Sequence, residues 1–429
     1  MKYIFLFLMI IGTIFIDLPL AQNIGTIGKS LMIFLAPTIA ALVYFFSKKA
    51  RILLNRFDVK LFWRYWIITS FLSLIMLNIN IFSTGDLNSI YGQNMFIKLL
   101  KASTYNLIFA LAYYNYSYVF MRLNYKVLSF VFVITFVFLT AIGFLEIHNK
   151  NIFNLFHNTS VNYNRLRLLT SEPSQAGLLY GIFFLLALFF TKNIFLRILA
   201  LITGLTVIYF ISSKGALLNI TIATAVVYFL SLNFKQKLKS SLIFIPVIAI
   251  LVYIFIPRFI GNLLVDIQNY TSFSTRFTGF VSALLVLIYY PLGTGYGTYL
   301  NYFPNIAEKA MMLVQNIFPL PLNFSELYNI IETGENIGLK SGVLFQILLN
   351  GWIAILFFSI LFIKSYRKLN MLNINIWQKI ILKILIIFIL LEITNSVDIE
   401  VMYAYIIPIA LIHNFYYLQK SKLQEKQIR

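Results

Sequence analysis

The sequence predicts an all-α, polytopic integral membrane protein with about 12 transmembrane helices. Hydrophobic residues make up 60% of the 429 positions and charged residues only 11%, and the mean hydropathy is +0.85. Soluble globular domains contain roughly 45–50% apolar and about 25% charged residues. Since a span needs about 20 apolar residues, the chain accommodates about a dozen spans. We expect a single transmembrane domain over residues 1–429, without a sizeable soluble domain.

The apolar stretches are expected to cross the membrane one after another. The first has the length of a signal peptide, but Lys2 is its only basic residue and no clear small-residue cleavage site follows it. We therefore interpret it as a retained span. The expected spans are 3–20, 30–47, 61–83, 99–121, 127–147, 175–191, 195–212, 215–233, 241–257, 341–363, 379–397 and 401–418.

Basic residues between the apolar stretches predict the topology. The net charge of +20 would suggest nucleic acid in a soluble protein. Here the basic residues form short runs between spans, as they do in cytoplasmic segments. We therefore expect both termini to be cytoplasmic, the loops 148–174 and 258–340 to be external, and no nucleic acid to be bound. The basic runs lie at Lys48–Lys60, Arg122–Lys126, Lys192–Arg197, Lys235–Lys239, Lys364–Lys383 and Lys420–Arg429.

Residues 258–340 are expected to form one large external loop that carries a surface or re-entrant helix. The apolar stretch 278–290 is short for a span of about 20 residues, and treating it as a span would place Lys364–Lys368 outside. A re-entrant helix is allowed where its backbone is buried in protein. Arg276 stands at the start of this helix, and Pro291 with the glycines of 293–297 ends it. We interpret these glycines as turn formers, since the pattern lacks the context of a nucleotide-binding loop.

Residue content restricts the cofactors. The chain has no cysteine and only 3 histidines, which are scattered at His148, His157 and His413. Disulfides, thiolate nucleophiles and zinc or iron–sulfur sites that need cysteine sulfur are thereby excluded, and no histidine cage is expected. We expect any enzyme built from this chain to work without a metal or another cofactor.

A positively charged loop meets a helix start at residues 165–174. Arg165 and Arg167 precede Glu172-Pro173-Ser174, which opens the apolar stretch from Leu178. A proline in the first helical turn and an acid near the positive helix end form a structural pattern in their own right. Arginines and a carboxylate at a membrane surface also suggest chemistry on an anionic lipid-linked substrate. The alternative is that the arginines are solvated charges or headgroup anchors.

Four segments of the chain occur in an order that resembles a known superfamily. They are Arg165–Gly177 with its arginines and Glu-Pro, Ile211–Leu218 with a Ser-Lys-Gly turn, Thr275–Gly297 with an arginine helix and a Gly-x-Gly turn, and Lys340–Trp352 at the entry to a span. This order resembles the O-antigen and capsular polysaccharide polymerase and ligase superfamily, and its repeat-unit (Wzy-like) polymerases in particular. The resemblance covers roughly residues 165 to 363.

Two positions depart from the pattern of that superfamily. Lys214 stands where its members usually carry arginine, which keeps the charge but loses the bidentate guanidinium. Leu168 stands where a glycine is often found between the loop arginine and the Glu-Pro. Either Arg165 or Arg167 therefore matches the loop arginine, and spacing to the glutamate favours Arg165.

The resemblance implies a metal-independent glycosyltransferase at the periplasmic face of the bacterial inner membrane. It would polymerise polyprenyl-diphosphate-linked oligosaccharide repeat units into O-antigen or capsular polysaccharide. Negative charge builds on the leaving diphosphate, and preorganised cations stabilise it. Arg165, Arg276 and Lys214 are the candidates for this clamp, with Arg167 as a further binding residue. The alternative is that Lys214 and Arg276 only extend to the membrane surface from their helices.

Carboxylates and tyrosines complete the candidate site. The acceptor hydroxyl must lose a proton, and Glu172 is the candidate base. Glu326, Glu332 and Glu335 in the large loop are the alternatives. Tyr296 and Tyr302 are candidates to line a glycan groove, although tyrosines are also typical of a membrane-interface belt. Glu392 inside an apolar span is costly unless it pairs with a loop arginine or lies along a proton path.

Two alternative functions remain. A ligase that transfers glycan to lipid A core usually carries a histidine in the large loop, and none occurs between Arg258 and Lys340. A lipid-linked oligosaccharide flippase should show internal repeats and charges along several spans, which the sequence lacks. Both comparisons favour the polymerase. The expected partners are the lipid bilayer, the polyprenyl-diphosphate-linked donor and acceptor, a chain-length regulator and a flippase.

Overall fold

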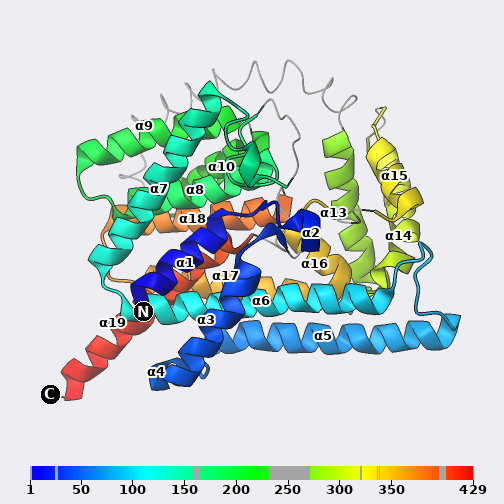
Figure 1. The fold of residues 1–429 in the computed structure, drawn as a ribbon, viewed down its shortest axis with the longest axis horizontal. Helices are drawn as coiled ribbons and strands as arrows, with labels where there is room; N and C mark the ends of the chain where they lie inside the picture. Colours follow the sequence, from blue (N-terminus) through cyan, green and yellow to red (C-terminus); the bar gives the residue numbers. More distant parts are fainter. Residues whose placement is uncertain are drawn as a thin grey trace. The chain divides into compact units, whose positions relative to one another are not determined.

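The computed structural model describes residues 2–24, 28–158, 165–211, 213–231, 271–318, 321–335, 337, 339–395 and 402–428. Within these ranges every regular element is a helix (Figure 1), which confirms the all-α prediction. The chain forms two compact units. Unit 1 comprises Met1–Ile68, Lys101–Ala223 and Leu356–Arg429, and unit 2 comprises Thr69–Leu100 and Thr224–Ile355.

Unit 1 is built around α8 (Pro173–Phe190). This helix contacts α7 (Tyr125–His148), α9 (Ile194–Ile211) and α18 (Ile376–Asn395). Nearly all of its residues are buried. Its glycines allow close packing, since the ring of Phe388 lies directly against Gly181. The remaining helices here are α1 (Lys2–Ile14), α2 (Ala21–Ile24), α3 (Met32–Phe46), α4 (Lys48–Leu53) and α19 (Ile406–Ile428), with 3-10 turns at Asn154–Phe156 and Tyr403–Tyr405.

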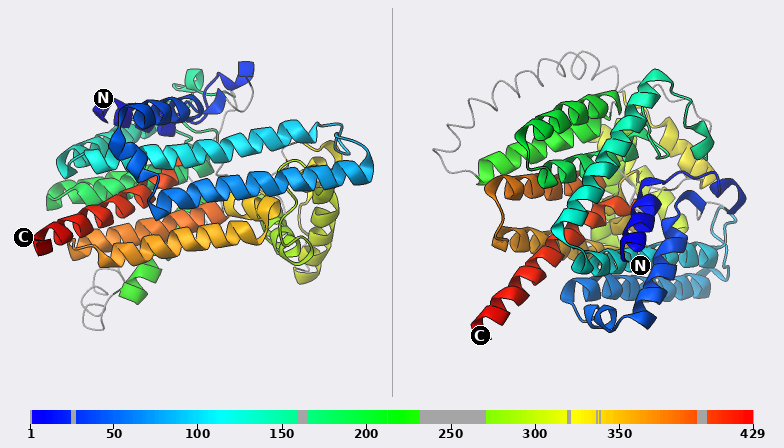
Figure 2. Two further views of the ribbon diagram at one scale, coloured as in Figure 1. Left: turned by 90° about the horizontal axis from the view of Figure 1, so that it is seen from below. Right: turned by 60° about the vertical axis from the view of Figure 1, so that its left-hand side comes forward.

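Four helices contribute residues to both units. The long helices α5 and α6 run antiparallel and side by side (Figure 2). In unit 1 the Phe62 ring stacks on Tyr113 with 4.0 Å between centroids, and the Trp66 indole donates to Ser103 Oγ at 3.1 Å. The four helices are α5 (Phe57–Thr84), α6 (Met95–Arg122), α10 (Lys214–Ser231) and α17 (Trp352–Met371).

Unit 2 is organised by α13 (Thr271–Tyr289). It packs against α14 (Tyr299–Ile317), α15 (Ser325–Thr333) and α16 (Gly342–Asn350). Apolar side chains of α13 and α14 form the core of this packing. The core residues are Val281, Ala310 and Val314, surrounded by Phe277, Leu285, Phe318, Leu322 and Phe324.

Most of the expected spans that fall on described residues coincide with helices. Five helices, α5 to α9, are long and apolar enough to cross a membrane by length and composition among the described residues. The total of about 12 spans stays a prediction, as do the single domain and the sides of the membrane. The expected span 241–257 lies outside the described residues.

The structure differs from expectation in three segments. The expected span 341–363 is interrupted at Gly351, between α16 and α17. The described part of the loop 258–340 contains three helices, α13 to α15, where one was expected. Arg276 lies in the second turn of α13, because that helix already begins at Thr271. Its first turn is mostly polar, so the apolar stretch 278–290 did not indicate it.

The interruption at Gly351 is closed by the turn that follows α13. Gly351 has a φ of 55°, and the turn glycines Gly293 and Gly295 have φ values of 87° and 80°, which confirms them as turn formers. Backbone hydrogen bonds join the two segments. They run from Thr294 N to Leu348 O at 2.9 Å, from Gly295 N to Leu349 O at 2.9 Å and from Trp352 N to Pro291 O at 3.0 Å.

Gly351→Ala should destabilise the protein more than Gly92→Ala. A Cβ at Gly351 would overlap the Pro291 carbonyl oxygen, whereas a Cβ at Gly92 meets nothing within 4 Å, although its φ is also positive at 69°. We expect a loss of about 3 kcal/mol at Gly351 and about 1 kcal/mol at Gly92. Thermal unfolding of the purified variants in detergent measures the difference. Equal losses would show that the contact with Pro291 contributes nothing.

Candidate functional site

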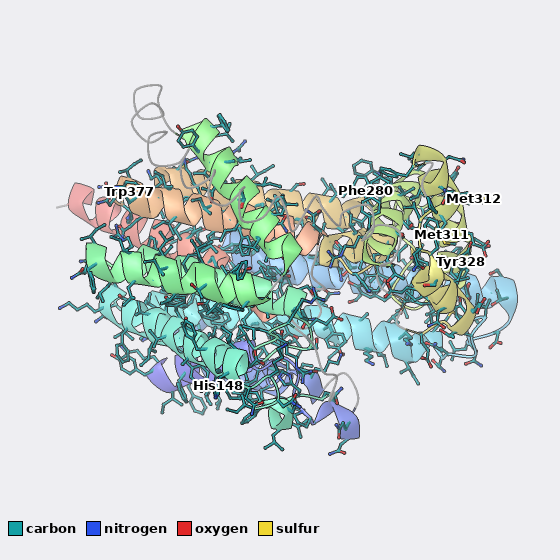
Figure 3. The ribbon with its side chains drawn as sticks, turned by 90° about the horizontal axis from the view of Figure 1, so that it is seen from above. His148, Phe280, Met311, Met312, Tyr328 and Trp377 are labelled. Carbon is teal, nitrogen blue, oxygen red and sulfur yellow. The ribbon has the colours of Figure 1, made fainter. Side chains whose placement is uncertain are left out.

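The arginine loop of unit 1 is held at the C-terminal end of α7, the helix that ends at His148 (Figure 3). The buried carboxylate of Glu146 accepts a hydrogen bond from Leu168 N at 2.9 Å. Leu168 has a φ of 51°, a left-handed conformation that glycine adopts without steric cost. This is the position where the resembled superfamily often carries glycine. The turn that a glycine would favour is therefore kept here with a buried leucine and a carboxylate.

The two loop arginines differ in exposure. Arg165 is exposed. Arg167 is 4% exposed, and its Nη2 donates to Asn154 Oδ1 at 2.9 Å. Arg167 therefore supports the loop, and Arg165 is accessible to a ligand. This difference agrees with the preference for Arg165 that the spacing indicated.

Glu172 caps α8 through its backbone and leaves its side chain exposed. Its carbonyl oxygen accepts from Ala176 N at 3.1 Å, and Pro173 occupies the first helical turn as expected. The carboxylate makes no capping bond, and among the described residues it accepts a long hydrogen bond of 3.4 Å from Ser174 Oγ. An exposed carboxylate at a positive helix end is placed to interact with a ligand hydroxyl.

The start of α8 packs against the start of α10. A Cβ at Gly177 would lie 2.7 Å from Ala216 Cβ and 3.2 Å from Ser213 Cβ, so glycine allows this close approach. Two of the four predicted segments, the Glu-Pro helix start and the Ser-Lys-Gly turn, are therefore neighbours. Lys214 begins α10, and its side chain lies outside the described part of the structure.

In unit 2, Glu326 joins the start of α13 to the entry of α16. Its Oε2 accepts from Thr275 Oγ1 at 2.9 Å, and its Oε1 pairs with Lys340 Nζ. Lys340 has a φ of 50°, and the next residue, Ser341, caps α16 by accepting from Leu344 N. Glu326 thus anchors three segments of the large loop.

The pairing determines the charge of Glu326. Burial alone would raise its pKa, but hydrogen bonding and attraction to the Lys340 ammonium, with hydrogen bonds from Thr275 and Thr271, hold the pKa of the carboxyl below its usual value. A carboxylate with a lowered pKa is a weak base. Glu326 is consequently a poorer candidate for the base than the exposed Glu172.

The remaining loop candidates lie in different environments. Arg276 is half-buried on α13 next to Thr275, and Glu332 is exposed on α15. Tyr296 is fully buried, and its N–H donates to Ser73 Oγ at 3.0 Å. Tyr302 is half-buried, with its ring centroid 5.1 Å from that of Tyr290. Since a buried ring offers no face to a sugar, Tyr302 is the better placed of the two tyrosines.

Exposed apolar side chains lie on α13, α14 and α15. Phe280 of α13, Met312 of α14 and Tyr328 of α15 are each about half exposed (Figure 3). Both α14 and α15 are amphipathic, with their buried residues on one stripe. Such helices suit a surface that contacts lipid or an amphipathic substrate.

Sequence reasoning missed several residues that shape these sites. Lys340 belonged to a recognised segment, but no role was assigned to it; its position among the acidic residues of the loop was the available signal. The buried pair His157–Asp17, with Nδ1 and Oδ2 3.3 Å apart, ties the N-terminal segment to the loop 148–174 and had no signal in the sequence. Glu392 was expected either to pair with a loop arginine or to lie along a proton path. In the structure its Oε1 accepts a hydrogen bond from Asn219 Nδ2 of α10 at 3.1 Å.

Each unit thus brings two predicted segments together. Unit 1 joins the Glu172 helix start to the Ser213 turn, and unit 2 joins the Arg276 helix to the Lys340 segment. The joint clamp of Arg165, Lys214 and Arg276 stays a prediction.

Comparison with known proteins gives one informative similarity. The chain is 28% identical over 279 residues to an uncharacterized 49.5 kDa protein in the cps region of Klebsiella pneumoniae. The alignment covers 63% of this chain and 62% of that protein, so the chain spans less than two thirds of its relative's length. No family model and no solved structure matches the chain. The similarity to a protein of a capsule region is consistent with a capsule-related membrane protein.

Glu326→Gln should lower the stability at neutral pH and have no effect in acid. Because the folded-state pKa of Glu326 is lowered, its charged form stabilises the fold above the usual carboxyl pKa, and this contribution is lost as the pH falls through the lowered value. We expect a difference of about 1 kcal/mol at pH 7 that begins to shrink near the usual carboxyl pKa of about 4.3 and is lost as the pH falls through the lowered value. Thermal unfolding against pH measures it. Glu332→Gln, an exposed carboxylate of the same helix, is the control and should show no difference at either pH.

Arg167→Ala should destabilise the protein, and Arg165→Ala should not. Removing the buried Arg167 side chain breaks its part-buried hydrogen bond to Asn154, which costs about 1–3 kcal/mol. Removing the exposed Arg165 should change stability by less than about 0.5 kcal/mol. Unfolding midpoints of the two variants decide the matter; a larger loss for Arg165 would contradict the structural roles assigned to both residues.

Proposed function

We propose that this protein polymerises polyprenyl-diphosphate-linked oligosaccharide repeat units into a capsular or O-antigen polysaccharide at the external face of the bacterial inner membrane. The observation that carries this proposal is the packing of the Glu172-Pro173 helix start against the Ser213-Lys214 turn. These two segments come from separate parts of the sequence, and both resemble motifs of the polysaccharide polymerases. The relative in a cps region supports a capsule-related role.

The reaction requires one bond to form and one to break. The acceptor hydroxyl oxygen attacks the anomeric carbon of the donor glycan, and the bond from that carbon to the diphosphate oxygen breaks. The polyprenyl diphosphate leaves with the bonding electrons, and the hydroxyl proton passes to a base. Charge therefore develops on the diphosphate, where fixed cations are most effective.

The described residues fit these roles to different degrees. Arg165 is exposed in the same loop as Glu172, so a diphosphate at this surface would meet an accessible guanidinium. Glu172 is the base in this proposal, because its carboxylate is exposed and makes no capping bond. Lys214 at the start of α10 supplies a second cation in unit 1, and the contribution of Arg276 to the same clamp stays a prediction. Glu326 positions the large loop 258–340 through its ion pair with Lys340. In this proposal Glu332 and Tyr302 of that loop contact the acceptor sugar.

Deletion of the gene should shorten the surface glycan to single repeat units on lipid, as seen when glycans are resolved by size. Arg165→Ala and Arg276→Ala should each reproduce the deletion with unchanged protein level. Lys150→Ala removes an exposed cation from the same loop as Arg165 and is the matched control, which should leave the long chains intact. Arg165→Lys tests the need for the guanidinium and should restore the chains only in part.

Other results would assign a different function. Polymer that accumulates on the carrier, with loss of all surface glycan, would indicate a ligase. Repeat units retained at the cytoplasmic leaflet would indicate a flippase. Full-length polymer from Arg276→Ala would remove that residue from the site.

A further inference from the structure

A buried polar network lies in unit 1 at the beginning of α5. Asp58 is fully buried and accepts from Arg56 Nη2 at 2.6 Å, from Arg56 Nε at 3.2 Å and from the Tyr113 hydroxyl at 2.7 Å. His413 Nδ1 lies 3.2 Å from the same carboxylate, and its Nε2 lies 3.0 Å from Ser365 Oγ. The carboxylate is therefore saturated by these contacts.

Two lysines beside this network lack such a counter-charge. Lys364 and Lys368 are one turn apart on α17, and among the described side chains neither forms an ion pair with a carboxylate. The Lys364 ammonium lies 3.2 Å from the centre of the Phe57 ring. The Lys368 ammonium lies 3.4 Å from the Tyr417 hydroxyl and 4.5 Å from the centre of that ring. Aromatic rings attract cations but do not neutralise them.

The local balance of charge is positive. Arg56 also stacks on Tyr417, with its guanidinium carbon 4.2 Å from the ring centre. The cations of Arg56, Lys364 and Lys368 therefore lie near one carboxylate, Asp58, which already accepts the hydrogen bonds described above. Lys368 lies beyond the end of the expected span 341–363. Burial lowers its pKa to about 8; the attraction of Asp58 opposes this shift, and Arg56 and Lys364 add to it. A half-buried ammonium that lacks its own anion is stabilised when one binds.

We propose that Lys364 and Lys368, beside Arg56, bind the phosphate group of an anionic phospholipid headgroup. The shared chemistry is a phosphate oxygen accepting from two ammonium groups. The lipid is the favoured source because Arg56 directly precedes α5, which is long and apolar enough to cross a membrane by length and composition, and the end of a spanning helix meets the lipid headgroups. The aromatic rings of Phe57, Tyr416 and Tyr417 provide the half-apolar surroundings of a headgroup-level site.

The geometry separates this site from general attraction of basic residues to anionic lipid. Lys48 and Lys49 on α4 also carry ammonium groups but are exposed, so they attract anionic lipid only through the field of an anionic membrane surface, which a neutral detergent micelle lacks. If Lys364 and Lys368 form a specific site, these two partly buried lysines must bind anionic lipid more tightly than the exposed Lys48 and Lys49 do.

Native mass spectrometry of the full-length protein in detergent tests the site. Phosphatidylglycerol and phosphatidylcholine with identical acyl chains are titrated against the wild type, Lys364→Gln/Lys368→Gln and Lys48→Gln/Lys49→Gln, which remove equal charge. We expect the first double variant to bind phosphatidylglycerol about tenfold more weakly, a change of about 1.4 kcal/mol. The second should stay within about twofold of wild type, because a neutral detergent micelle has no anionic surface that attracts exposed lysines. Lys364→Arg/Lys368→Arg should retain binding because both cations remain.

Thermal unfolding separates loss of the site from loss of the fold. Phosphatidylglycerol should raise the midpoint of the wild type and leave that of Lys364→Gln/Lys368→Gln unchanged, because only a ligand that binds the folded state stabilises it. Equal lipid binding by that variant and the wild type would overturn the proposal. Displacement of the lipid by inorganic phosphate, at an ionic strength where chloride has no effect, would identify the free ion as the occupant and overturn the lipid assignment.

Discussion

A helix that is interrupted in apolar surroundings exposes carbonyl and N–H groups that water cannot reach, and each such group must find a partner within the protein. In unit 2 this requirement links the glycine turn after α13 to the break between α16 and α17. The break at Gly351 leaves the carbonyls of Leu348 and Leu349 without their helical donors, and the turn after α13 supplies the N–H groups of Thr294 and Gly295. Gly293 is needed because a Cβ there would overlap the backbone of Leu349 and Asn350, and Gly295 suits its position because its φ is positive at 80°.

Carboxylates contact two residues that have left-handed backbone conformations. Leu168 and Lys340 are the non-glycine residues with positive φ in the described parts of the chain. Each is held by a carboxylate: Glu146 accepts the Leu168 N–H, and Glu326 pairs with the Lys340 side chain. Strained residues persist only where their surroundings determine their conformation. Both lie next to segments that carry candidate ligand-binding groups, so strain and candidate function occur together in each unit.

Hydropathy predicted the helices that depend on long apolar runs. The expected spans 127–147 and 175–191 correspond to α7 and α8 within a few residues, since an apolar run in a membrane has helix as its main option. Hydropathy did not predict α14 and α15, because an amphipathic helix has a polar half and its mean hydropathy is low. It also missed the break at Gly351. A single glycine in an apolar run is compatible with an unbroken helix, and the turn that stabilises the break is distant in sequence.

The candidate site shows where residue types alone stop being informative. Arg165 and Arg167 are chemically identical and two positions apart, yet one is exposed and the other is bonded to Asn154. Glu172 and Glu326 were both candidates for a base, and the presence of Lys340 separates them. A group already committed to holding the fold cannot give up its partner at each turnover without loosening the loop that it anchors. Within the described residues 165–174, Arg165 and Glu172 are the exposed charged groups, and this is why the proposed reaction assigns its roles to them.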